Sequence, residues 1–216
     1  MAIKWLIDAS YFVAAVLFIL GLKGMSSPVS ARKGIIWAGV GMVLATVVTF
    51  LTPGMNNFAL MVIAIAIGGA LAWISGKKVA MTDMPQMVAI YNGMGGGAAA
   101  AIAAVEFARG EMHGTVVTLL ATLGALIGAV SFSGSVIAWA KLQGVMKKAF
   151  RLPAQNAVNV VLALATLGLG AAIVIAPAID PMLVGAFFIL ALVLGVIITL
   201  PIGGADMPVV ISLFNA

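Results

Sequence analysis

Residues 182–200 read MLVGAFFILALVLGVIITL and contain neither a charged side chain nor a proline. A run of this length and polarity suits a helix that crosses a bilayer, which needs about 20 mostly apolar residues. The rest of the chain has the same character, because 64% of its 216 residues are hydrophobic and only 8% are charged. A water-soluble domain of this size could not bury so much apolar surface. The sequence therefore predicts an all-α bundle of transmembrane helices.

Charged loops and Pro/Gly breaks divide the chain into seven complete apolar spans and the start of an eighth. The eighth begins near Met207, and the chain stops inside it, where backbone groups would be left unpaired in lipid. We therefore expect the chain to be part of a longer protein. The seven complete spans are predicted at 5–22, 34–52, 57–75, 84–106, 112–140, 155–176 and 182–200.

Basic residues alternate from loop to loop. The second and sixth loops have none, and the fourth has only Arg109. By the positive-inside rule, the odd-numbered loops face the cytoplasm and the N-terminus lies outside. The net charge of +5 then serves membrane insertion, so we expect the lipid bilayer and no nucleic acid as a partner. The odd-numbered loops contain Lys23, Arg32 and Lys33, then Lys77 and Lys78, then Lys141, Lys147, Lys148 and Arg151.

One pattern occurs twice, at the start of the fourth and of the eighth span. Residues 83–92 read DMPQMVAIYN and residues 206–215 read DMPVVISLFN. An Asp followed closely by Pro is a common way to begin a helix, so Asp83 and Asp206 are predicted N-caps. Each asparagine, Asn92 and Asn215, then lies about 13 Å into the membrane by the helical rise. An amide at that depth needs partners, and it serves either a polar passage or helix–helix packing.

Other polar residues fall in or near the spans. Ser131, Ser133 and Ser135 lie near the inner end of the fifth span, where each hydroxyl could simply bond back to its own helix. Ser135 precedes Lys141 by six residues, which gives it a depth of about 9 Å, similar to that of the two asparagines. His113, at the outer end of the same span, is a weaker candidate for proton exchange, because an interfacial histidine needs no transport role.

Small residues cluster next to these polar groups. Gly93 and residues 95–97 follow Asn92, and Gly128 and Gly134 flank two of the serines. Within an apolar span such a stretch predicts a face where another helix packs closely, rather than a phosphate-binding loop.

Chemistry within this chain alone is not expected. It has no cysteine, one histidine and six carboxylates, so we predict neither a metal site nor a catalytic residue. No nucleotide-binding fingerprint is present either.

Three segments resemble the membrane part of the beta subunit of proton-translocating NAD(P) transhydrogenases. They are MPQMVAIYNG at 84–93, SGSVIAWAKLQG at 133–144 and IGGADMPVVISLFN at 202–215, and the resemblance covers essentially the whole chain. It implies that residues 1–216 form a proton-conducting domain of a multi-pass protein of the bacterial inner membrane, in a family whose beta subunit has nine spans. It also implies that hydride transfer between NAD(H) and NADP(H) takes place elsewhere, with no cofactor bound by this chain. The implied partners are the alpha subunit, with its membrane helices and NAD(H) domain, the NADP(H)-binding domain of the full-length chain, and a second copy.

Individual residues acquire roles from this resemblance. Asn215 and Ser135 fall on positions associated with the proton path, and Asp206 falls on the acidic residue near the docking site of the NADP(H) domain. Many relatives have a histidine at the position of Asn92, and an asparagine cannot titrate. Together, Asn92, Ser135 and Asn215 are predicted to surround one passage, with Asp83 as a weaker candidate.

Two alternatives from other classes stay open on the sequence. The paired motifs in two parallel helices would also suit a secondary transporter for a small solute. A purely structural membrane subunit is the third possibility, and it predicts that both asparagines tolerate apolar replacement.

Overall fold

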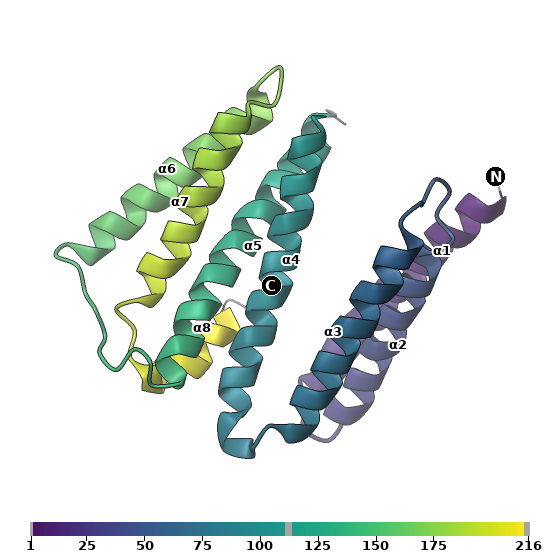
Figure 1. Cartoon of the computed structure of the whole chain (residues 1–216), viewed down its shortest axis with the longest axis horizontal. Coiled ribbons are helices and arrows are strands. Elements are labelled where there is room, and N and C mark those ends of the chain that lie inside the picture. Colours follow the sequence, from purple (N-terminus) through teal and green to yellow (C-terminus); the bar gives the residue numbers. More distant parts are fainter. Residues whose placement is uncertain (1, 111–113, 214–216) are drawn as a thin grey trace. The chain divides into compact units, whose positions relative to one another are not determined.

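A computed structural model of the chain describes residues 2–110 and 114–213. The described residues form α-helices joined by loops (Figure 1). A 3-10 turn comes directly before two of the helices. The helices are α1 (Ala2–Met25), α2 (Ala31–Thr49), α3 (Phe58–Lys78), α4 (Met84–Arg109), α5 (Thr115–Leu142), α6 (Gln155–Ile175), α7 (Pro181–Thr199) and α8 (Met207–Leu213), and the 3-10 turns are η1 (Met81–Asp83) and η2 (Gly204–Asp206).

Seven of these helices, α1 to α7, are long and apolar enough to cross a membrane. The all-α polytopic prediction is therefore confirmed, and α8 begins at Met207 as expected. The second helix ends at Thr49, before the predicted limit of residue 52. Residues 50–52 continue beyond it as turns, because their N–H groups donate to carbonyls three residues earlier instead of four. The fifth helix is described from Thr115, and the predicted start at residue 112 lies outside the described residues.

The chain forms two compact units, residues 1–77 and 78–216. In the first unit, α1 and α2 form a tightly packed hairpin. The backbones meet closely, because a methyl group added at Gly21 would lie 2.9 Å from the carbonyl oxygen of Gly34. Polar side chains meet further along, where the Tyr11 hydroxyl and Thr49 Oγ1 lie 2.9 Å apart. No residue of α3 is buried within the described part of the chain.

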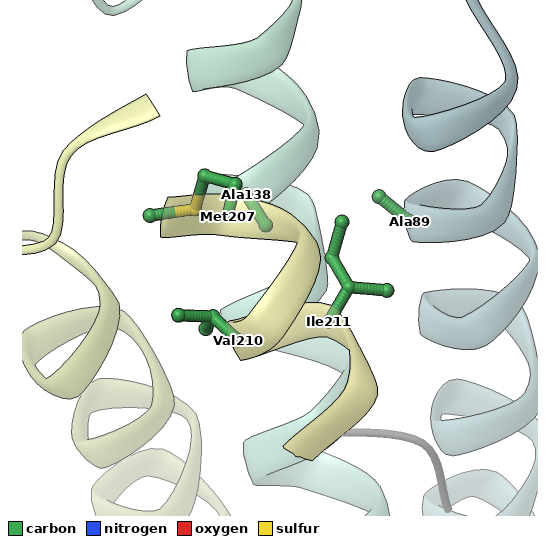
Figure 2. Close-up of a cluster of buried hydrophobic side chains, with 5 residues drawn as sticks. All are labelled: Ala89, Ala138, Met207, Val210 and Ile211. Atoms are coloured by element: carbon green, nitrogen blue, oxygen red, sulfur yellow. The ribbon is translucent and has the colours of Figure 1, made fainter. Parts of the chain in front are cut away.

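In the second unit, α5 is the central helix, since it packs against α4, α6, α7 and α8. One core cluster lies towards the C-terminal ends of α4 and α6, and consists of Ala103, Phe107, Ala125, Ile173 and Phe187. The other cluster, at the opposite end, brings Ala89 of α4 and Ala138 of α5 against Met207, Val210 and Ile211 of α8 (Figure 2). The short α8 thus lies where α4 begins and α5 ends.

Candidate functional site

The repeated Asp-Met-Pro motif has the same local structure in both places. Each Asp is the last residue of a 3-10 turn, and the following Met begins an α-helix with Pro in its first turn. Proline fits there because its missing N–H would be unpaired anyway. Asp83 is the N-cap residue of α4, as predicted, but its side chain accepts no capping hydrogen bond. The 3-10 turn explains this, because it leaves Asp83 at φ −100° and ψ 2° instead of the extended backbone of typical N-caps.

Asn92 is the polar centre of the second unit. Its Nδ2 donates to Ser135 Oγ at 3.1 Å and to the carbonyl oxygen of Ile211 at 3.5 Å. These partners belong to α5 and α8, so one amide on α4 reaches two other helices. Ser135 is completely buried. The structure therefore brings together two of the three residues predicted to surround a passage, at the similar depth that the helical rise indicated.

The third predicted residue, Asn215, lies outside the described residues, as does His113. On α8, the group that meets Asn92 is a backbone carbonyl, that of Ile211. Asp206 is exposed at the end of η2, one residue before the fully buried Met207. An exposed acidic side chain and a fully buried apolar one are thus adjacent in sequence at the start of α8.

Glycine allows α4 to approach α5 closely enough for the Asn92–Ser135 hydrogen bond. A methyl group at Gly96 would lie 2.8 Å from the Gly128 carbonyl oxygen, and one at Gly93 would lie 3.1 Å from Ser135 Cβ. Contacts this short leave no room for a side chain. The predicted close-packing face is therefore present, one turn along the helix from Asn92.

The serines divide between two roles. Ser133 Oγ donates to the Ala129 carbonyl of its own helix at 3.0 Å, as the simpler interpretation predicted. Ser135 instead accepts from another helix. Ser133 also lies where α7 approaches α5, because a methyl group added at Gly195 would collide with the Ser133 hydroxyl and the backbone of Val130. This second close approach, between α5 and α7, was not predicted from the sequence.

A further polar group on α4 was missed. The side-chain oxygen of Gln86 is buried and accepts no hydrogen bond within the described part of the chain. Gln86 precedes Ala89 by three residues and Gly93 by seven, so it lies on the face that α4 turns towards α5 and α8. A buried amide oxygen is a good acceptor for water, and one at this position lies between Asn92 and the start of α4.

Lys141 was counted among the residues of the fifth loop, and that assignment is wrong. It lies inside α5 and is 7% exposed. The sequence contained a signal for this, because Lys141 directly continues the apolar run 136–140 and is six residues from Lys147.

Within the described residues, no group of three His, Asp or Glu side chains could hold a metal ion.

Comparison with known proteins places this arrangement in a family. Residues 7–216 match the family model described as NAD(P) transhydrogenase beta subunit. Two curated proteins named NAD(P) transhydrogenase subunit beta, one from Rhodospirillum rubrum and one from a designated strain of that species, are each 42% identical to the chain over 219 residues. The match covers 96% of this chain but 46% of each relative, so the chain spans about half the length of these proteins. The chain is a multi-pass membrane protein and belongs to the NAD(P) transhydrogenase beta subunit family.

Proposed function

We propose that this chain is the proton-conducting membrane domain of a transhydrogenase, formed by residues 1–216. In this proposal, hydride transfer between NAD(H) and NADP(H) occurs on other domains and is coupled to proton movement through the helices. Membership of the family supports the transhydrogenase role. The match to about half of each relative supports a division of labour, with nucleotide sites in the remaining half and in partner subunits.

The observation that carries the proposal is the contact of Asn92 with Ser135 and with the Ile211 carbonyl. A polar group within a span is costly unless it is paired, so three such groups from three helices indicate more than lipid-facing packing. Asn92 cannot gain or lose a proton at neutral pH. The proton therefore moves along water held by the amide, hydroxyl and carbonyl groups, with the buried Gln86 oxygen as a further acceptor towards the start of α4.

The same proposal assigns partners and orientation. The chain assembles with an alpha subunit and a second copy of itself, and it lies in the bacterial inner membrane with its basic loops in the cytoplasm. Asp206, exposed at the start of α8, faces the NADP(H)-binding domain of the full-length protein. A movement of that domain is then transmitted along α8 to the Ile211 carbonyl, which contacts Asn92.

Ser135→Ala and Ser133→Ala form a matched pair that tests the proposal. Both remove one hydroxyl from the same helix, but only Ser135 contacts Asn92. Loss of one hydrogen bond is worth about 1 kcal/mol, so Ser135→Ala should slow proton pumping about fivefold in proteoliposomes of the full-length enzyme. Ser133→Ala should pump near the parent rate. Equal rates for both variants would leave the Asn92 cluster as packing only and would favour a structural subunit.

A further inference from the structure

Lys141 has an unusual environment for a lysine in a membrane span. Its ammonium group donates to three backbone carbonyls, those of Thr199 at 2.9 Å, Leu200 at 2.5 Å and Ile202 at 2.6 Å. Thr199 ends α7, and the other two residues belong to the connection from α7 to η2 and α8. A side chain near the end of α5 is thus bound to the backbone that leads into α8.

The partners of the Lys141 ammonium group are backbone carbonyls, one at the end of α7 and two in the connection after it. The last carbonyls of a helix lack partners within the helix and have partial negative charge, so an ammonium group there is favourable. All three N–H groups of Lys141 are donated to these carbonyls, so the side chain is fully used in binding the backbone at the end of α7 and just after it.

Two more donors from the segment after α5 bind the same end of α7. The Phe150 backbone N–H donates to the Leu200 carbonyl at 3.1 Å. Gln155 Nε2, at the start of α6, donates to the Ile197 carbonyl at 3.0 Å. Lys141 and Gln155 are both buried. Lys141, Phe150 and Gln155 thus all donate to carbonyls at or just after the end of α7. Together they fix where α7 ends and where the connection to α8 begins.

The start of α8 is held by α5 in a second way. Met207, its first residue, is fully buried and packs in one cluster with Ala138, which lies three residues before Lys141 on α5 (Figure 2). Residues three apart lie on neighbouring parts of a helix surface. The same region of α5 therefore binds the connection through Lys141 and receives the first turn of α8 through Ala138.

We infer that Lys141 is a positioning residue that anchors the start of α8, and with it Asp206 and the carbonyl that Asn92 reaches. The functional consequence rests on the proposed proton-conducting role. A displacement of the connection would move Asp206 and the Ile211 carbonyl together, since a single helix of seven residues contains or adjoins both. Lys141 thereby links the helix that bears Ser135 to the helix expected to respond to the NADP(H)-binding domain.

The test uses the full-length enzyme with Met207→Cys as a reporter, because residue 207 is inaccessible while α8 is held in place. In detergent, without nucleotide, the thiol should react slowly in the reporter protein and at least about tenfold faster in Lys141→Met, which removes three charged hydrogen bonds. Lys141→Arg should give an intermediate rate, because a planar guanidinium keeps the charge but cannot direct three donors from one nitrogen. Lys148→Met, the same substitution at an exposed loop position, is the matched control and should react at the reporter rate.

Proton pumping per hydride transferred provides the second readout. We expect this ratio to fall in Lys141→Met, to recover partly in Lys141→Arg and to stay unchanged in Lys148→Met. Unchanged labelling of the reporter thiol, or raised labelling with an unchanged ratio, overturns the inference. Labelling is measured in the resting enzyme, so it does not depend on proton conduction, whereas failure of the proposed function would appear in the Ser135→Ala variant.

Discussion

The contact between α4 and α5 can be tested with two adjacent glycines. A methyl group at Gly96 would lie 2.8 Å from the Gly128 carbonyl oxygen and 2.9 Å from Ser131 Cβ, both well inside normal contact distances. At Gly95, no described atom outside the local helix lies within 4 Å of the added methyl. Gly96→Ala must therefore push the two helices apart, and Gly95→Ala need not.

The magnitude follows from two opposing effects. Replacing Gly by Ala inside a helix is worth about 1 kcal/mol from helix propensity, and this gain is common to both variants. Overpacking costs about 1–3 kcal/mol, and it applies to Gly96 alone. When the free energies of unfolding of the two variants are compared, the gain from helix propensity cancels. Gly96→Ala should therefore be about 1–3 kcal/mol less stable than Gly95→Ala.

The assay is unfolding of the purified full-length protein in mixed micelles with increasing denaturing detergent, followed by tryptophan fluorescence. Gly96→Ala should also slow proton pumping more than Gly95→Ala, because Gly96 is one turn from the Asn92–Ser135 hydrogen bond. Equal stability of the two variants, or greater stability of Gly96→Ala, would refute the close approach of α4 and α5 at this position.

Two further predictions concern orientation and coupling. Cysteines substituted for Ser27, Gly76 and Ala149 should not react with membrane-impermeant thiol reagents in intact cells, because the basic loops are expected to be cytoplasmic. Reaction of all three from outside would reverse the topology. Asp206→Asn should impair NADP(H)-linked turnover of the full-length enzyme more than Asp83→Asn does, since only Asp206 is expected to face the NADP(H)-binding domain. If both variants have equal and negligible effects, Asp206 serves only to begin a helix.

The spans were predictable because lipid imposes strict requirements on a helix. Apolar runs must be long enough to cross, and breaks must coincide with polar or Pro/Gly segments, so seven spans follow from the sequence alone. The remaining errors are local. The α-helix α2 ends at Thr49 because residues 50–52 continue with tighter i→i−3 hydrogen bonds, and Asp83 makes no side-chain cap bond because a 3-10 turn precedes α4.

The candidate site was predictable in part because depth can be counted along a helix. Counting residues placed Asn92 and Ser135 at one level, and the 3.1 Å hydrogen bond joins them there. Counting residues along a helix does not reveal which faces of two helices contact each other. The Ile211 carbonyl is a backbone group without a sequence signature, so no motif could have identified it as a partner of Asn92.

Lys141 shows the limit of a rule based on charge alone. Counting basic residues per loop assigns every lysine near a span end to water, because most are exposed there. Lys141 instead meets the carbonyls at the end of α7, a partner 58 residues or more away in sequence. Only the packing of α7 against α5 brings these groups together, and the glycine that allows it, Gly195, lies within an uninterrupted apolar run.

Proton pumping by Asn92 variants of the full-length enzyme, reconstituted in proteoliposomes, tests the central claim most directly. Asn92→Leu keeps the approximate size of the side chain but removes the donor that joins α4 to α5 and α8, so it should cut pumping strongly while the protein still inserts and assembles. Asn215→Leu should act in the same direction, and Asn92→His should keep appreciable pumping, since relatives are expected to have histidine there. Thr166→Val is the control, because the Thr166 hydroxyl bonds to the Leu162 carbonyl of its own helix and, within the described residues, to no other helix. Full pumping by both leucine variants would contradict the account and leave these asparagines as packing residues.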